Sequence, residues 1–186
     1  DPLPGFLAEL QGISDTWLAH RQMAEKRFAL ASFNAEYLSR FPCAIVRQSG
    51  RVIAFANVWA GAGQAELSAD LIRYRPGAPP GLMEYLLVEL MLWGRQEGYR
   101  WFNLGMGPLA GMEDQPLAPL WTRTAGLTFR HGAHFSSLAE LRQFKDKFAP
   151  VWQAKYRVSP GGLALPRIVA DVATLIAGKP LGPKLK

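Results

Sequence analysis

One stretch of the sequence decides the fold: AELSADLIRY (residues 65–74), then RPGAPPG (75–81), then LMEYLLVELMLWGRQE (82–97). The first segment is mostly apolar and predicts a strand, and the prolines and glycines of the second predict a loop. The third repeats apolar residues at helical spacing, which predicts a helix over 81–97 that ends at Gly98. The residues expected on the core side of this helix are Leu82, Tyr85, Leu86, Leu90 and Trp93.

Two further apolar runs precede this stretch and one follows it. Ala44–Gln48 and Val52–Trp59 are joined by Ser49-Gly50-Arg51, a short link that indicates a hairpin. Trp101–Leu104 predicts a buried strand that closes a β-α-β unit with the strand at 65–74. Three antiparallel strands, a helix and a further strand resemble the order of acetyltransferase-like (GNAT) domains. We therefore expect an α/β (α+β) fold, a GNAT-like acyltransferase fold with a mixed, mostly antiparallel sheet flanked by helices.

The remaining segments are expected to add helices before and after this unit. Helical spacing predicts a long helix within 5–24 and a short one around Asn34–Arg40. The later elements are a Gly/Pro-rich loop (105–119), a helix near 119–127, a helix at Leu138–Phe148, a strand-like run at Val151–Val158 and a final helix at Leu163–Ala177. The chain opens at Asp1 without an initiator Met, which indicates a piece of a longer protein. Residues 1–40 are expected to lead in from a missing upstream lobe, and 41–186 to form the GNAT-like lobe.

Composition narrows the class of partner. A formal charge of +6 and a pI near 9.7 suit a polyanion, either RNA or an anionic lipid surface, and charge alone does not choose between them. There is no run of eighteen apolar residues, so no segment of the sequence is predicted to span a bilayer. Cys43 is the only cysteine, which excludes an intrachain disulfide and favours a reducing compartment. Its apolar neighbours indicate a buried strand start rather than a nucleophile.

The loop before the long helix is where GNAT enzymes hold the pyrophosphate of coenzyme A with backbone N–H groups. Here residues 73–81 carry three prolines, Pro76, Pro79 and Pro80. Proline lacks the N–H donor and stiffens the backbone. A coenzyme A site is therefore not expected, and no cofactor is predicted.

Asp70 and Arg73 are two charged residues in an otherwise apolar strand. Burying them is costly unless they are paired. In a regular strand they would face opposite sides, and a bulge could bring both to one face. One interpretation is a structural ion pair. In the other, Asp70 orients or deprotonates a hydroxyl and Arg73 binds a phosphate or oxyanion.

Basic residues are densest between 123 and 157. The set comprises Arg123, Arg130, Arg142, Lys145, Lys147, Lys155 and Arg157, against only Glu140 and Asp146. Aromatic residues interleave with them, which is typical either of a core or of a surface that stacks an RNA end. A solvated basic face remains the alternative. His131 and His134 lack metal-ligand spacing, so no metal site is predicted.

In these segments the sequence resembles the aminoacyl-phosphatidylglycerol synthases, also called the multiple peptide resistance factor or phosphatidylglycerol lysyltransferase family. The resemblance covers about 165 residues, and each stretch is weak alone but specific in this order. The matching stretches are 13–18 (ISDTWL), 25–28 (EKRF), 54–57 (AFAN), 68–74 (SADLIRY), 98–99 (GY), 102–106 (FNLGM), 108–109 (PL), 141–148 (LRQFKDKF), 150–152 (PVW) and Tyr156.

The resemblance implies two tandem GNAT-like lobes, of which this chain is the second, behind a membrane-embedded flippase domain. It implies transfer of a lysyl or alanyl group from aminoacyl-tRNA to a glycerol hydroxyl of phosphatidylglycerol, at the cytoplasmic face of the inner membrane. The ester is already activated, so neither ATP nor coenzyme A is implied. The product lipid is less anionic, which would weaken the binding of cationic antimicrobial peptides.

The resemblance also suggests roles for individual residues. Asp70 and Arg73 match the family's strand motif and are the candidate catalytic pair, with Tyr156 as a candidate proton donor to the leaving 3′ oxygen. The residues expected to bind tRNA or lipid phosphate are Arg142, Lys145, Lys147 and Arg123. Two other functions stay open: a coenzyme A-dependent GNAT N-acyltransferase, and a non-catalytic module that binds RNA or anionic membranes.

Overall fold

The structure is a computed structural model that describes residues 3–20, 32–107 and 133–155, with isolated positions at 164, 167, 168 and 171. The predicted helix near 119–127 and most of the loop at 105–119 lie outside the described residues, as does most of the predicted C-terminal helix. The chain divides into two compact units, one formed by 1–103 with 158–186 and the other by 104–157, and each is described by itself. None of the described helices is long and apolar enough to cross a membrane.

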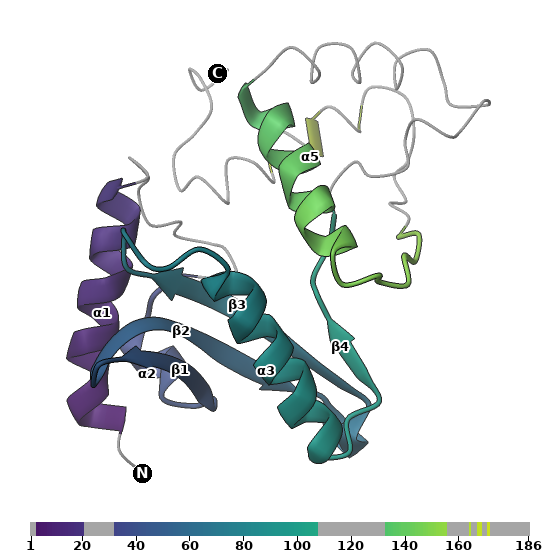
Figure 1. The fold of residues 1–186 in the computed structure, drawn as a ribbon. Helices are drawn as coiled ribbons and strands as arrows, with labels where there is room; N and C mark the ends of the chain where they lie inside the picture. The colour runs from purple at the N-terminus through teal and green to yellow at the C-terminus, as the bar shows by residue number, and fades with distance from the viewer. Residues whose placement is uncertain are drawn as a thin grey trace. The chain divides into compact units, whose positions relative to one another are not determined.

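The first unit is built on a four-stranded sheet in the order β1-β2-β3-β4 (Figure 1). The strands are β1 (Cys43–Gln48), β2 (Arg51–Ala60), β3 (Glu66–Tyr74) and β4 (Trp101–Asn103). The first three pair antiparallel, and β4 pairs parallel with β3 through only three residue pairs at the start of β3. The helix α3 (Leu82–Gln96) connects β3 to β4. The predicted α/β fold with a mixed, mostly antiparallel sheet flanked by helices is confirmed.

Glycine and serine make the tight turns that this order needs. Ser49 and Gly50 adopt φ values of 50° and 80° between β1 and β2, and Gln48 pairs with Arg51 across the turn. A type I′ hairpin turn is one in which both central residues adopt the left-handed conformation. The predicted Ser-Gly hairpin is therefore confirmed.

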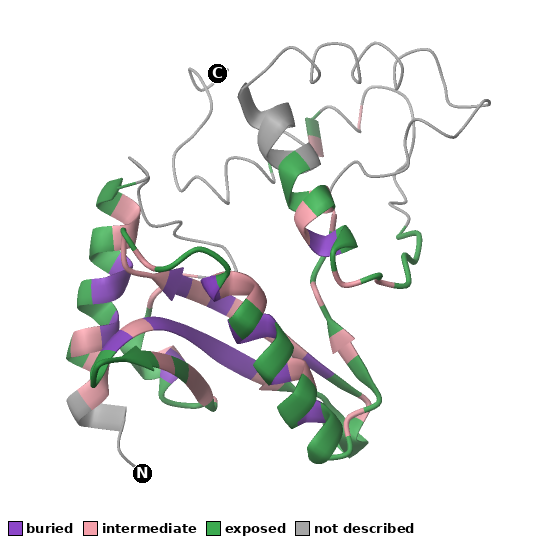
Figure 2. Cartoon of the chain, in the orientation of Figure 1, coloured by how far each residue is buried: buried purple, intermediate pink, exposed green. Residues whose placement is uncertain are grey.

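The sheet carries a separate core on each face. On one face α1 (Leu3–His20) and α2 (Ala35–Leu38) pack against the strands, and the buried members are Leu10, Ile13, Leu38, Val52, Phe55 and Leu71. On the other face α3 packs, and the buried members are Ala56, Val58, Leu67, Leu86 and Leu90. Figure 2 shows the buried residues running along β2, which lies between the two cores. The segment ahead of β1 is thus an integral part of the packing.

The core side of α3 differs from the prediction at two aromatic residues. Tyr85 is 55% exposed and Trp93 is 38% exposed, so both predicted core positions are wrong. The helix instead turns Leu87 and Gly94 toward the sheet, along with the predicted leucines. A Cβ on Gly94 would lie 2.8 Å from Leu67 Cδ2, so the absence of a side chain there allows close approach. Gly98 has a φ of 86° just after the helix, which confirms the predicted C-terminal glycine.

The second unit contains the helix α5 (Ala133–Asp146). It begins before the predicted start at Leu138 and ends close to the predicted end. Residues 151–155 are exposed and form no strand, so the prediction of a strand-like run there is wrong. Trp152 instead donates its indole N–H to Asp146 Oδ1 at 2.9 Å. Among the described residues, no strand pairs with this segment, although its apolar residues alternate.

Candidate functional site

A bulge in β3 places the two charged residues of the strand. Ala56 pairs with Ile72, whereas Val58 pairs with Ala69, so Asp70 and Leu71 together lie opposite Asn57. One extra residue in a strand reverses the side-chain alternation beyond it. Without such a bulge, Asp70 and Arg73 would face opposite sides of the strand.

Asn57 stabilises this bulge from β2. Its Oδ1 accepts the backbone hydrogen of Leu71 at 2.6 Å, and the Asn57 side chain is fully buried. A bulge leaves a backbone group outside the regular ladder, and an unpaired buried N–H is costly. The Asn57 amide therefore takes the place of the missing strand partner.

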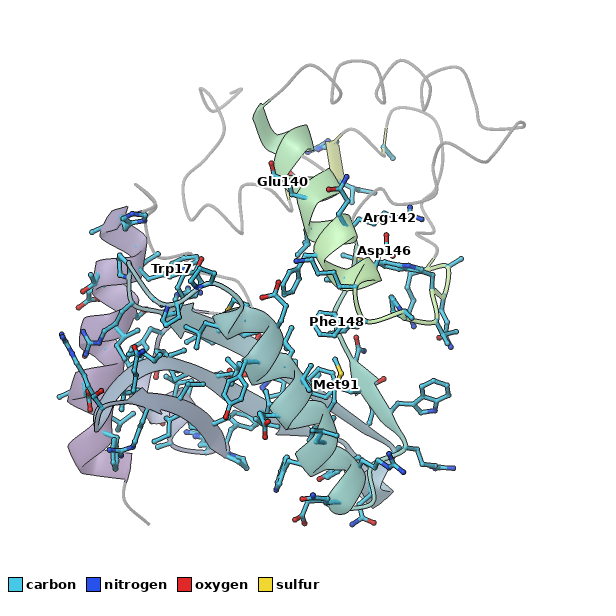
Figure 3. The ribbon with its side chains drawn as sticks, in the orientation of Figure 1. Trp17, Met91, Glu140, Arg142, Asp146 and Phe148 are labelled. Carbon is cyan, nitrogen blue, oxygen red and sulfur yellow. The ribbon has the colours of Figure 1, made fainter. Side chains whose placement is uncertain are left out.

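Asp70 and Arg73 lie on the sheet face that α1 and α2 cover. The guanidinium carbon of Arg73 lies 4.2 Å from the ring centre of Trp17 on α1. Figure 3 labels Trp17 on this helix. Asp70 Oδ2 accepts a hydrogen bond from the Tyr37 hydroxyl of α2 at 3.3 Å. Leu71, between them, is buried in the core beside α1. The bulge thus brings the predicted pair to one face.

Arg73 is almost enclosed, with 8% of its surface exposed. Its Nη1 donates to the carbonyl of Ile72 at 3.1 Å, and the Trp17 ring lies against its guanidinium plane. Trp17 also meets Tyr74 edge-on, with ring centres 6.4 Å apart. A guanidinium held by an aromatic ring is a fixed positive charge that can bind phosphate or an oxyanion with little reorganisation.

Asp70 is partly buried, and its partner Tyr37 belongs to an aromatic cluster with Phe41 and Trp59. Burial, and then the nearby Asp70 carboxylate, raise the pKa of the Tyr37 hydroxyl, while Trp59 acts in the opposite direction. The phenol therefore keeps its proton across the physiological range and remains a hydrogen-bond donor to Asp70. A carboxylate held in this way can orient a hydroxyl or accept its proton.

In the second unit, Lys145 is buried rather than solvated, with 6% of its surface exposed. Its Nζ donates to the carbonyls of Gly105 at 3.1 Å and Met106 at 2.9 Å. Burial lowers the pKa of the Lys145 ammonium. An ammonium has three N–H donors, so these two bonds leave one for a ligand.

The two other basic residues predicted on α5 are engaged with neighbours in the second unit. Arg142 Nε lies 3.8 Å from Asp146 Oδ2 (Figure 3). The Arg142 guanidinium carbon lies 5.4 Å from the Trp152 ring centre. Lys147 Nζ lies 5.5 Å from the ring centre of Phe144. Both positions remain accessible to a polyanion. Arg123 and Tyr156, the other predicted site residues, lie outside the described residues.

Backbone amides in and next to the loop between β3 and α3 donate hydrogen bonds to carbonyls of the same loop. Ala78 N donates to the Arg75 carbonyl at 3.2 Å, and Leu82 N donates to the Pro79 carbonyl at 3.3 Å. Gly81 begins α3 with a φ of 81°. Amides that are bonded within the loop are not available to cradle a pyrophosphate.

A pocket of about 200 Å³ lies between α3 and β4, on the sheet face opposite Asp70 and Arg73. Its lining includes no predicted site residue; the lining residues are Leu67, Met91, Gly94, Arg95, Tyr99, Arg100, Trp101 and Phe102. Nor do the residues that the structure describes contain a group of three or more His, Cys, Asp and Glu side chains able to hold a metal ion.

Three residues at the Asp70 and Arg73 pair received no predicted role from the sequence. Asn57 is a polar residue within an apolar strand, which is a signal that could have found it. Trp17 and Tyr37 carry no such local signal, because each reaches the pair only through the packing of a helix on the sheet.

The sequence and fold of the chain are similar to those of one protein family. The family described as phosphatidylglycerol lysyltransferase, C-terminal, matches residues 2–159. Among curated proteins, phosphatidylglycerol lysyltransferase of Bacillus subtilis (strain 168) is 40% identical over 153 residues, covering 81% of this chain and 18% of the relative. The protein of the same name from Staphylococcus aureus (strain COL) is 36% identical over 154 residues, covering 82% of this chain and 18% of the relative.

Two solved structures are similar to the chain over most of its length. The C-terminal domain of a putative lysylphosphatidylglycerol synthetase from Agrobacterium fabrum gives a TM-score of 0.79 at 37% identity, covering 98% of this chain and 54% of that one. The structure of L-PGS from Bacillus licheniformis gives a TM-score of 0.69 at 34% identity, covering 93% and 51%. The chain spans about a fifth of the curated relatives and about half of the solved chains. On this basis the chain belongs to the family of phosphatidylglycerol lysyltransferase C-terminal domains.

Proposed function

We propose that this chain is the catalytic lobe of an enzyme that transfers an aminoacyl group, lysyl or alanyl, from aminoacyl-tRNA to phosphatidylglycerol. The observation that carries the proposal is the bulge that sets Asp70 and Arg73 on one face of the sheet. The curated relatives named phosphatidylglycerol lysyltransferase support the lipid acceptor. The tRNA donor is our inference from the family resemblance and from the basic character of the chain.

The reaction needs a hydroxyl to attack an ester. In the proposed mechanism, Asp70 orients a glycerol hydroxyl of phosphatidylglycerol and accepts its proton as the hydroxyl oxygen bonds to the acyl carbon. Arg73 stabilises the negative charge that develops on the ester oxygen, or binds the lipid phosphate. The bond between the acyl carbon and the ribose 3′ oxygen then breaks, and Tyr156 donates its phenolic proton to that oxygen. Asp70 is left protonated and Tyr156 as the phenolate, and proton exchange with solvent restores both groups before the next turnover.

The basic residues of the second unit are proposed to bind phosphate groups of the tRNA or the lipid. Lys145 can offer its remaining N–H from a fixed position, because its other two donors hold the carbonyls of Gly105 and Met106. Arg142, Lys147 and Arg123 would contribute further positive charge. In this assignment Lys145 binds phosphate from a fixed position, whereas the other three residues attract the polyanion through their charge alone.

No cofactor is proposed, because the aminoacyl ester supplies the activated carbonyl. The bonding around the loop at 75–81 supports this choice over coenzyme A chemistry, since the amides of Ala78 in the loop and of Leu82 at the start of α3 are already occupied. Saturable binding of coenzyme A to the protein would contradict it.

We further propose that the chain works within a longer polypeptide, as the second of two GNAT-like lobes behind a membrane-embedded flippase domain. The solved relatives, of which this chain covers about half, support the second lobe. The site of action would be the cytoplasmic face of the inner membrane. Aminoacylation of the lipid would reduce the negative surface charge and so weaken the binding of cationic antimicrobial peptides.

The test is a transfer assay on the full-length protein that contains this chain. Radiolabelled lysyl-tRNA or alanyl-tRNA is mixed with vesicles of phosphatidylglycerol, and labelled lipid is separated and counted. We expect Asp70→Asn and Arg73→Lys each to lower the rate by about a hundredfold or more. Arg95→Lys, in the pocket on the opposite face of the sheet, is the matched control and should keep the wild-type rate. Steep salt-dependent RNA binding without any turnover would instead establish a non-catalytic binding module.

A further inference from the structure

Tyr37 contacts the carboxylate of the proposed catalytic pair from outside the sheet. Its hydroxyl donates to Asp70 Oδ2 at 3.3 Å across 33 residues of sequence. In the part of the chain that the structure describes, this is the hydrogen bond that the Asp70 carboxylate accepts. Oδ1 of Asp70 is therefore left to accept a bond from another molecule.

The direction of the Tyr37 side chain is fixed by the cap of α2. Asn34 Oδ1 accepts the backbone hydrogen of Tyr37 at 2.9 Å, and Asn34 O accepts that of Leu38 at 2.8 Å. Leu38 is buried in the core beside α1 and ties the short helix to the sheet. A helix of four residues has little stability of its own, so these contacts determine where Tyr37 points.

Aromatic packing holds the Tyr37 ring in place. Its centre lies 4.9 Å from that of Phe41, and Phe41 in turn lies 6.3 Å from Trp59 of β2. Neighbouring rings at these separations stabilise one another and restrict rotation. The hydroxyl therefore meets Asp70 from a fixed position rather than from a mobile side chain.

We propose that Tyr37 is a positioning residue for Asp70, binding Oδ2 so that Oδ1 is presented to the attacking hydroxyl. This inference rests on the proposed function of Asp70 in hydroxyl activation. Tyr37 does not touch the reacting atoms and acts through the carboxylate alone. A carboxylate free to rotate would spend less time in the productive orientation, which lowers the rate of the chemical step more than the binding of substrate.

A double-mutant cycle on the full-length protein tests this role. Tyr37→Phe keeps the ring and removes the hydroxyl; we expect kcat to fall about tenfold with KM little changed. In the Asp70→Asn background, whose residual transfer is followed in long incubations, Tyr37→Phe should cause no further loss. Tyr85→Phe, at an exposed site on α3, is the matched control and should leave kcat unchanged. Equal losses from Tyr37→Phe in both backgrounds would overturn the proposal.

A second measurement reports the contact without any activity. With tyrosine labelled at the Cζ carbon, the Tyr37 resonance is assigned by its loss in Tyr37→Phe, and its phenol is titrated by NMR. Asp70→Asn should lower the Tyr37 pKa, because the carboxylate is one of the causes that raise it. An unchanged titration would overturn the Tyr37 inference even if transfer is observed. Absence of transfer by the wild-type protein, with the titration shift present, would instead overturn the proposed function.

Discussion

Asn57 and Leu71 are joined by a hydrogen bond of 2.6 Å from the Leu71 backbone to the Asn57 side chain. The bond connects the middle of β2 to the bulge of β3, where the extra residue sets the direction of every side chain that follows. Arg73 shares the face of Asp70 because of that extra residue. The geometry of the candidate site therefore depends directly on the register between β2 and β3.

Asn57→Ala should destabilise the protein because it leaves the Leu71 N–H buried without an acceptor. We expect the free energy of unfolding to fall by about 1–3 kcal/mol. Urea denaturation followed by circular dichroism measures this change. Gln96→Ala, at an exposed position of α3, should change the stability by less than about 0.5 kcal/mol. A loss no larger for Asn57 than for Gln96 would show that the bulge does not need its side-chain acceptor.

Trp17→Leu should destabilise the protein more than Trp17→Phe, because phenylalanine retains an aromatic face for the Arg73 guanidinium. The expected difference between the two variants is about 1–2 kcal/mol in the free energy of unfolding. The same pair of substitutions at Trp101, which is 60% exposed, should differ little and serves as the control. Equal effects of leucine and phenylalanine at position 17 would argue that only apolar packing matters there.

Lys145→Met should loosen the segment that begins the second unit, because two carbonyls lose their ammonium partner. Hydrogen exchange of a peptide covering 104–107 should become faster, whereas Lys147→Met should leave it unchanged. Burial lowers the pKa of Lys145 from its ordinary 10.5, so the folded protein binds fewer protons here than the unfolded chain. The stability of the wild type relative to Lys145→Met should therefore rise as the pH approaches 10.5. A flat difference across alkaline pH would contradict this.

Cys43 should react slowly with iodoacetamide in the folded protein. Burial raises the pKa of its thiol to about 11, so little thiolate exists near neutrality. Alkylation at pH 8, followed by mass spectrometry, should be about a hundredfold slower than in urea. The folded state holds this proton more tightly than the unfolded chain, so stability should fall as the pH rises from 9.0 to about 11. Cys43→Ala should remove that part of the pH dependence.

The elements that the sequence predicted correctly depend on local chemistry. The hairpin follows from the conformations open to Ser49 and Gly50, and the end of α3 from those of Gly98. The order of strands and helix follows from hydrophobic periodicity. Asp70 and Arg73 could be singled out because charged residues are unusual in an apolar strand. The sequence predicted that they share a face only if the strand contained a bulge.

The features that the sequence did not predict depend on distant contacts. Tyr85 and Trp93 have the right spacing for the core, yet the close approach of Gly94 to Leu67 turns the helix away from them. Lys145 appeared to be one of many surface cations, and the carbonyls that bind it lie 39 and 40 residues earlier in the chain. Tertiary packing decides such positions, and no local pattern records it.

Trp17 and Tyr37 both precede β1, although the residues that they support belong to β3. A chimera of two related proteins that exchanges the chain at residue 41 would therefore combine the sheet of one parent with the supporting helices of the other. Even with every strand intact, its carboxylate and guanidinium would be held by mismatched neighbours. A crossover placed upstream of α1 keeps each parent's pair with its own supports.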